Sequence, residues 1–74
     1  SPVQLSKVFK ETTGERLLDY INKVRLKKAK ELLRESGKSL EEISRISGYS
    51  SLWTFMRAFK KYEGITPGKF KELV

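Results

Sequence analysis

The chain of 74 residues lacks cysteine and histidine entirely, and these two absences exclude several kinds of chemistry. Without cysteine there is no disulfide and no thiolate metal site. Without histidine the chain lacks the most frequent general base, metal ligand and near-neutral pH switch in proteins. The acidic residues stand mostly at helix starts and on solvent faces, and no glycine-rich phosphate loop is present. We therefore expect neither an enzyme nor a protein with a bound metal or cofactor.

Long hydrophobic runs are also absent, because no apolar run exceeds three residues. A membrane-spanning helix needs about 20 apolar residues and a signal peptide roughly 7–15. The sequence therefore predicts a soluble, cytoplasmic protein with no membrane contact. A chain of this length makes one domain at most, with a small core.

Positive charge is what the chain has in excess. The 16 Lys and Arg residues outnumber the 9 Asp and Glu residues and give a net charge of +7, with an isoelectric point near 9.9. This balance is typical of proteins that bind nucleic acids. A soluble basic helical protein without such a partner would show the same balance, so charge alone leaves both interpretations open.

The sequence predicts helices joined by short turns, and it lacks the alternation of apolar and polar residues that is typical of strands. Ser or Thr caps, some followed by proline, mark the helix starts, and glycines mark the ends. The expected helices cover residues 2–12, 17–35, about 40–47, about 52–62, and a short segment from 67 onward. Apolar spacing assigns these side chains of the last three helices to the core: Leu40, Ile43, Ile46, Phe55, Phe59, Tyr62, Phe70 and Leu73.

The helix expected over residues 17–35 has an unusually wide apolar arc, made of Leu17, Leu18, Tyr20, Ile21, Val24, Leu26, Ala29, Leu32 and Leu33. A surface helix normally shows a narrower stripe. We therefore expect this helix to be a central strut that packs on two sides. Arg25 stands inside the arc, where its stem can lie along apolar surface or its guanidinium can pair with a carboxylate. A structural role for Arg25 is favoured over a contact with DNA.

Residues 1–14 and 51–64 look like two copies of one short basic helix. Each copy opens with Ser, carries a Phe-Lys pair and closes on Gly four residues after that pair. In the first copy, helical spacing turns Val3, Lys7 and Lys10 outward. Val3 could contact a thymine methyl, Lys7 a guanine edge or phosphate, and Lys10 a phosphate. Two such helices in a basic chain suggest contact with DNA at two places.

Residues 39–62 have the pattern of a helix, a three-residue turn and a second helix, which predicts a helix-turn-helix. The second helix of that motif enters the major groove of DNA. Opposite its expected core face stand Trp53, Arg57 and Lys60, with Met56 at the flank. Arg57 can form a bidentate pair with guanine, and Trp53 can cover a thymine methyl or a sugar edge. The expected phosphate contacts of this unit are Ser50, Ser51, Thr54, Lys60 and Lys61.

The run from residue 48 to 67, which ends in Phe59-Lys60-Lys61 and Gly64-x-Thr66-Pro67, resembles the C-terminal signature of AraC/XylS-type transcription regulators. Residues 5–14 are similar to that family's first recognition helix. The resemblance covers nearly the whole chain. Five residues look like the family's linker helix: Tyr20, Arg25, Ala29, Leu32 and Leu33.

The resemblance implies an all-α, homeodomain-like fold in which two helix-turn-helix units are joined by one long helix. It implies a recognition helix of a truncated first unit at 1–14, a linker helix at 15–37 and a complete second unit at 38–74. It also implies sequence-specific binding to double-stranded DNA in the major groove, within a bacterial regulator that has a separate regulatory domain and contacts RNA polymerase. The implied base-reading residues are Val3, Ser6 and Lys7 in the first unit, and Leu52, Trp53, Met56 and Arg57 in the second.

Several residues depart from the family pattern. The two helices that precede the first recognition helix are missing, so we expect a weakened first unit and self-association through its uncovered inner face. Ser44 and Ser47 stand where the family usually has Ala and an aliphatic residue, and Ser47 is expected to loosen the packing. Arg16 is a poor cap for the long helix. Trp53 stands where a small or polar residue is common, which indicates a base preference of its own.

An alternative function is a helical protein-interaction module. In that interpretation Leu52, Trp53 and Met56 would form a hydrophobic contact patch for a partner helix. Binding to a protein that is insensitive to salt, without binding to DNA, would favour it. A role at a membrane surface has less support, because the basic residues do not border one clean apolar stripe.

Overall fold

Four helices follow one another along residues 16–74, the part of the chain that the computed structural model describes. They are α2 (Leu17–Glu35), α3 (Leu40–Ile46), α4 (Leu52–Glu63) and α5 (Pro67–Leu73). The starts and ends agree with those expected from the sequence to within about one residue, and this part of the chain contains no strand. The all-α prediction is confirmed. The helix expected over residues 2–12 lies outside the described residues.

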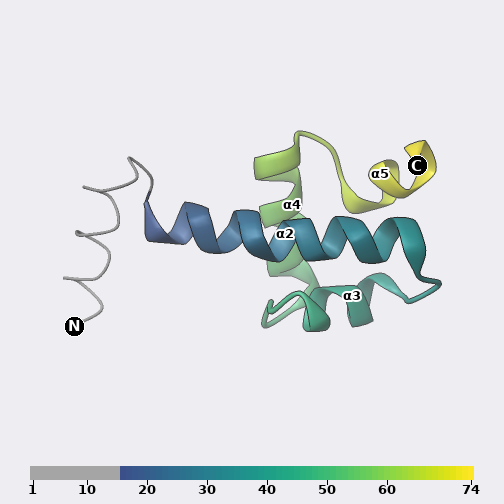
Figure 1. Cartoon of the computed structure of the whole chain (residues 1–74), viewed down its shortest axis with the longest axis horizontal. Helices are drawn as coiled ribbons and strands as arrows, with labels where there is room; N and C mark the ends of the chain where they lie inside the picture. The colour runs from purple at the N-terminus through teal and green to yellow at the C-terminus, as the bar shows by residue number, and fades with distance from the viewer. Residues whose placement is uncertain (1–15) are drawn as a thin grey trace.

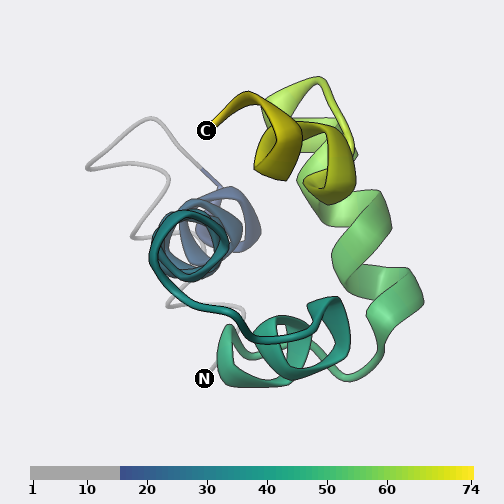
Figure 2. The ribbon, with the colours of Figure 1, turned by 90° about the vertical axis from the view of Figure 1, so that its right-hand side faces the viewer.

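The long helix α2 is the axis on which the other helices are arranged (Figure 1). In Figure 1 α3 and α5 lie on opposite sides of α2, and α4 crosses behind it. Figure 2 looks along α2 and shows α3, α4 and α5 following one another around one side of it. Each of these three helices contacts α2. One face of α2 therefore organises the described part of the molecule.

Side-chain caps begin three of the helices, as the sequence predicted. In each case a hydroxyl oxygen accepts a hydrogen bond from the backbone N–H three residues later, which satisfies one of the unpaired donors of the first turn. Ser39 accepts from Glu42 (3.2 Å), Ser51 from Thr54 (3.1 Å) and Thr66 from Lys69 (3.1 Å). Arg16 makes no side-chain cap bond at the start of α2, as expected for this residue type.

The core lies between α2 and the three later helices. Leu26, Ala29 and Leu33 of α2 are buried against a group of side chains from the second half of the chain: Ile43, Tyr49, Phe55 and Phe59. Aromatic rings run through this core in a chain, with Phe59 in contact with Phe55 and with Phe70 at centroid distances of 5.8 and 5.6 Å. Such tilted and edge-on ring pairs add to the stabilisation from burial alone.

Two residues assigned to the core by their spacing are exposed, and these assignments were wrong. Ile46 is 38% exposed and Leu73 is 66% exposed. In α3 the buried side is centred on Ile43, Ser44 and Ser47, and Ile46 lies about 110° away from that centre around the helix. Leu73 is the last residue of α5, one turn beyond Phe70, which is the α5 side chain that packs against the core.

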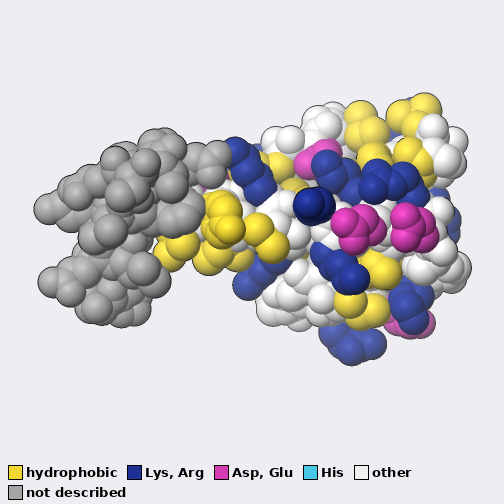
Figure 3. All heavy atoms as spheres, in the orientation of Figure 1, with side chains coloured by type: hydrophobic (Ala, Val, Ile, Leu, Met, Phe, Trp, Pro, Cys, Tyr) yellow, Lys and Arg dark blue, Asp and Glu magenta, His cyan; other side chains and the backbone are white. Residues whose placement is uncertain are grey.

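The apolar arc of α2 is buried on one side only within the described residues. Leu18 and Val24, in the first half of the helix, are 64% and 53% exposed. Figure 3 shows hydrophobic side chains at the surface of this half of α2. The expected packing of α2 on a second side is therefore not provided by α3, α4 or α5. No helix in residues 16–74 is both long enough and apolar enough to cross a membrane.

Candidate nucleic-acid interface

The outward face of α4 presents the side chains that the sequence predicted for it. Because Phe55 and Phe59 are fully buried, helical periodicity places Trp53, Arg57 and Lys60 on the opposite side, and all three are exposed. Trp53 is 66% exposed, which is a large apolar surface for a single residue. The prediction that this ring belongs to a functional surface rather than the core is consistent with its position.

Trp53 and Arg57 form a stacked pair on this face. The guanidinium carbon of Arg57 lies 4.6 Å from the centre of the Trp53 ring, at the i, i+4 spacing that brings side chains together on a helix. Stacking uses the flat face of the guanidinium and leaves its N–H edges available for hydrogen bonds. The pair therefore presents an exposed aromatic surface and a set of hydrogen-bond donors side by side.

The remaining predicted residues of the second unit surround this pair. Ser50, Ser51 and Thr54 are exposed at the start of α4, and the hydroxyl oxygens of Ser51 and Thr54 are 2.9 Å apart. Since Ser51 also accepts the capping bond, its first role is to fix the start of the helix. Lys60 and Lys61 are exposed in the last turn.

The structure separates the predicted base-reading residues into exposed and half-buried ones. Leu52 and Met56 are half-buried, and Leu52 packs against the core. Only part of the Leu52 side chain is therefore open to a ligand. Four predicted contact residues of the first unit, Val3, Ser6, Lys7 and Lys10, lie outside the described residues.

Two tyrosines, Tyr49 in the turn before α4 and Tyr62 in α4, form hydrogen bonds with α2. Sequence reasoning missed both contacts. The Tyr49 hydroxyl donates to Oδ1 of Asn22 at 2.7 Å, and the Tyr62 hydroxyl donates to Oδ1 of Asp19 at 2.7 Å. Lys30 of α2 and Glu63 of α4 also form an ion pair, with Nζ and Oε1 3.0 Å apart. The signal in the sequence was the presence of two polar residues, Asp19 and Asn22, beside the apolar arc of α2.

Both phenols are harder to ionise than an ordinary tyrosine. Burial raises the pKa of Tyr49 above its usual value of 10.0, and the cation of Arg25 opposes that effect. The hydrogen bond to the Asp19 carboxylate raises the pKa of Tyr62, and burial adds to it. The two hydroxyl groups therefore remain protonated donors to α2 throughout the neutral range.

Arg25 has the structural contact that the sequence left open. Its guanidinium carbon lies 5.4 Å from the centre of the Tyr49 ring, so the partner that the structure shows is an aromatic ring. Gly48 gives the arginine this space, since a Cβ at that position would come within 3.1 Å of Nε of Arg25. Gly48 also has a φ of +101°, a left-handed conformation that glycine adopts without steric cost.

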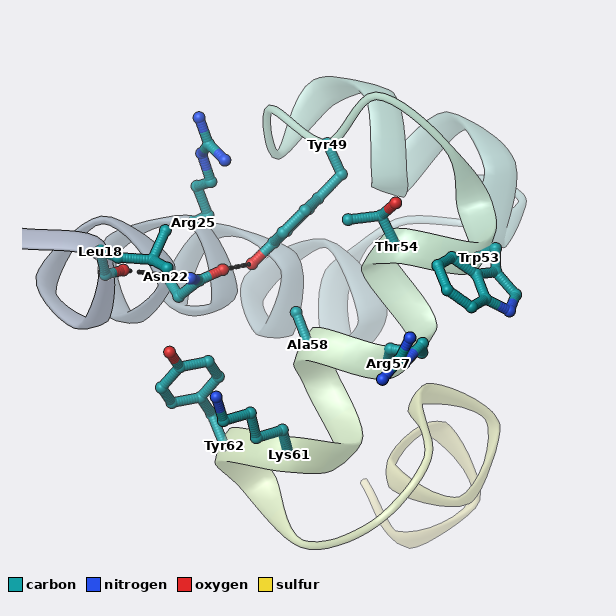
Figure 4. A pocket seen from close by; sticks show the side chains of 10 residues that line it. All are labelled: Leu18, Asn22, Arg25, Tyr49, Trp53, Thr54, Arg57, Ala58, Lys61 and Tyr62. Carbon is teal, nitrogen blue, oxygen red and sulfur yellow. Dashed lines mark hydrogen bonds between the residues drawn. The ribbon is translucent and has the colours of Figure 1, made fainter.

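A groove opens between α4 and the first half of α2 (Figure 4). It has a volume of about 520 Å³. Figure 4 shows Trp53 and Arg57 on the α4 side, Arg25 on the α2 side, and Lys61 beside Tyr62 at the lower edge. Ten residues line it: Leu18, Asn22, Arg25, Tyr49, Trp53, Thr54, Arg57, Ala58, Lys61 and Tyr62. The outward pair of α4 is therefore also one wall of a basic groove.

Comparison with known proteins gives consistent matches over nearly the whole chain. Residues 1–72 match the sequence profile of a family described as "Helix-turn-helix domain". The "Probable transcription factor PqrA" of Proteus vulgaris is 41% identical over 68 residues, which are 92% of this chain and 56% of that protein. The chain thus spans about half the length of this relative.

Solved structures give the same result. The C-terminal domain of the two-component response regulator yesN from Fusobacterium nucleatum matches with a TM-score of 0.90 at 35% identity. The match covers 96% of this chain and 69% of the chain of that structure. A transcriptional regulator from Chromobacterium violaceum, described as a protein with an AraC-type DNA-binding domain, matches with a TM-score of 0.84 at 30% identity. The match covers 97% of this chain and 64% of the chain of that structure.

Proposed function

The chain belongs to the AraC-type family of helix-turn-helix transcription regulators, and we propose that its α4 reads base sequence in the major groove of DNA. The observation that carries this proposal is the stacked pair of Trp53 and Arg57 on the exposed face of a well-capped helix. An α-helix with its side chains is about 10–12 Å wide and the major groove is about 12 Å wide. The net charge of +7 supplies the attraction to phosphates that brings the helix there.

Arg57 and Trp53 are proposed to divide the readout between neighbouring bases. Arg57 donates two hydrogen bonds to O6 and N7 of a guanine, and Trp53 covers the methyl group of an adjacent thymine. Because the two side chains stack on each other at 4.6 Å, they are restrained before DNA arrives, and less freedom is lost on binding. A guanine next to a thymine is therefore the step that this pair selects.

The other contacts of this unit are proposed to position the helix rather than to read bases. Ser50, Ser51, Thr54, Lys60 and Lys61 contact phosphates, with the exposed hydroxyls and cations noted above as support. Met56 and the exposed part of Leu52 add apolar contacts to base edges.

The division of the chain into a first unit at 1–14, a linker helix at 15–37 and a second unit at 38–74 is part of the same proposal. Val3, Ser6 and Lys7 are the proposed base-reading residues of the first unit, and Lys10 a phosphate contact. The parent protein is proposed to contain a separate regulatory domain and to contact RNA polymerase, as the resemblance to transcription regulators of this family implies. Self-association of the chain and the absence of enzymatic activity are proposed on the sequence alone.

Protein binding through Leu52, Trp53 and Met56 remains the alternative, but it has less support. Leu52 and Met56 are half-buried, and one face of the Trp53 ring carries the Arg57 guanidinium. A contact patch for a partner helix normally offers a continuous apolar centre with charges at its rim. Here a cation lies directly over the exposed aromatic ring of the patch, which favours a partner that accepts hydrogen bonds.

The test is selection of bound duplexes from a random pool, followed by affinity measurements with Arg57→Ala and Lys60→Ala. Loss of Arg57 should relax base choice at one position, by about 1–3 kcal/mol of discrimination. Loss of Lys60 should weaken all duplexes alike. Both side chains are exposed, so the fold should survive each change. If the two variants weaken every sequence equally, the proposed readout by Arg57 is wrong.

A further inference from the structure

We propose that the groove between α2 and α4 holds one sugar–phosphate strand of the DNA, and that Arg25 of α2 contacts a phosphate in it. This inference rests on the proposed function, because it takes α4 to be the helix inside the major groove. It extends that function to α2, whose Arg25 the sequence alone assigned to a structural role. The strand enters the groove along the wall that Trp53 and Arg57 form.

Two hollows lie beside α4. The groove of about 520 Å³ includes side chains of α2. A second hollow, of about 390 Å³, is lined by Met56, Arg57, Lys60, Lys61 and Thr66. Arg57 and Lys61 border both, so this edge of α4 is the ridge between them. A helix inserted in the major groove has one DNA strand on each flank, and each hollow provides the space for one of them.

The charged side chains around the groove are all positive. Arg25, Arg57 and Lys61 all border the groove, and none of the described residues that line it is acidic. The carboxylate next to it, Asp19, already accepts the hydrogen bond from Tyr62. Several cations around a concave surface concentrate positive potential there. A DNA strand, with one phosphate per nucleotide, is the polyanion that this arrangement fits.

The turn before α4 holds the Arg25 side chain in place. Its guanidinium lies over the Tyr49 ring at 5.4 Å, in the space that Gly48 leaves open. A contact with a ring does not use up the N–H donors of a guanidinium, which can still form two parallel bonds to phosphate oxygens. The contact with Tyr49 therefore orients the arginine as a phosphate ligand and does not compete with that role.

The experiment compares Arg25→Gln with Lys27→Gln, both made in this 74-residue chain. The glutamine at 25 keeps part of the stem but removes the charge. Lys27 is exposed on α2 and lies about 160° around the helix from Arg25, away from the groove. Binding to a random-sequence duplex of about 20 base pairs is measured over a series of salt concentrations. Thermal unfolding of each variant checks that the fold is retained.

Arg25→Gln should weaken binding about tenfold at low salt. It should also reduce the slope of log affinity against log salt by about 0.9, the value for one lost phosphate contact. Lys27→Gln should leave the slope close to that of the unchanged chain. Equal slopes for the two variants would overturn the role of Arg25 while leaving the proposed function standing. If the unchanged chain binds no duplex at all, the proposed function fails, and this inference fails with it.

A second measurement separates contact from a general effect on folding. Phosphates of a selected duplex are replaced one at a time by uncharged methylphosphonates, and each duplex is bound to the unchanged chain and to Arg25→Gln. One of these replacements should lower the affinity of the duplex for the unchanged chain but leave its affinity for Arg25→Gln unchanged, as in a double-mutant cycle. A purely structural role would lower affinity for all these duplexes by the same factor, and that pattern would overturn the proposal.

Discussion

Removal of one hydroxyl oxygen from Tyr49 and from Tyr62 should have different effects on stability, although the chemical change is the same. Tyr49→Phe takes away the donor to Asn22, a residue that is only 7% exposed. The amide nitrogen of Asn22 keeps its bond to the Leu18 carbonyl at 3.0 Å, but Oδ1 loses its partner in a buried place. An unsatisfied buried acceptor costs about 1–3 kcal/mol.

Tyr62→Phe takes away the donor to Asp19 in a more open place. Asp19 is half-buried and the bond itself is only partly buried, so water can replace the lost donor. The expected cost is about 0.5–1.5 kcal/mol. In a domain of this size each kcal/mol lowers the melting temperature by about 4–8 °C. Thermal and urea unfolding followed by circular dichroism at neutral pH would measure both differences.

Tyr49→Phe should cause the larger loss of stability, and a matched double-mutant cycle tests whether Asn22 is the cause. The variants Tyr49→Phe, Asn22→Ala and the double variant are unfolded under the same conditions. The double variant should lose less stability than the sum of the single losses, because both remove the same bond. A loss at Tyr62 as large as the one at Tyr49, or strictly additive losses in the cycle, would refute the argument.

Two further predictions follow from the same contacts and from α3. Because the pKa of both Tyr49 and Tyr62 is raised in the folded state, the unfolded chain loses these protons first, so stability should fall as pH rises above about 10. The fall in unfolding free energy should be smaller in the double Phe variant, and an unchanged pH profile would contradict the assignment. Within residues 16–74 the buried Oγ of Ser47 has no hydrogen-bond partner, so Ser47→Ala should stabilise by about 1 kcal/mol. Ser44→Ala should instead destabilise by about 0.5–1.5 kcal/mol, since the Ser44 hydroxyl donates to the Ser51 carbonyl at 3.2 Å. Urea unfolding measures the change in unfolding free energy for both serine variants. Changes of the same sign would contradict the different roles given to the two hydroxyls.

The outward face of α4 could be predicted from the sequence because it depends on local geometry. Once Phe55 and Phe59 are assigned to the core, a period of 3.6 residues fixes Trp53 and Arg57 on the far side. The groove beside that face could not be predicted in the same way. It needs Arg25 of α2 and Tyr49 of the turn to lie next to α4, and residues so far apart in the chain meet only when the helices pack.

The sequence by itself determined which segments are helices and where they begin, because caps such as Ser39 and Ser51 act within a single turn. Only the tertiary structure decided burial where local spacing gave a wrong assignment or none, since Ile46 is exposed while Tyr49 of the turn enters the core. It also decided that Arg25 has a tyrosine ring as a partner. The physical reason is that a helix start is stabilised by neighbours along the chain, whereas burial and side-chain contacts between helices depend on the angles at which those helices cross.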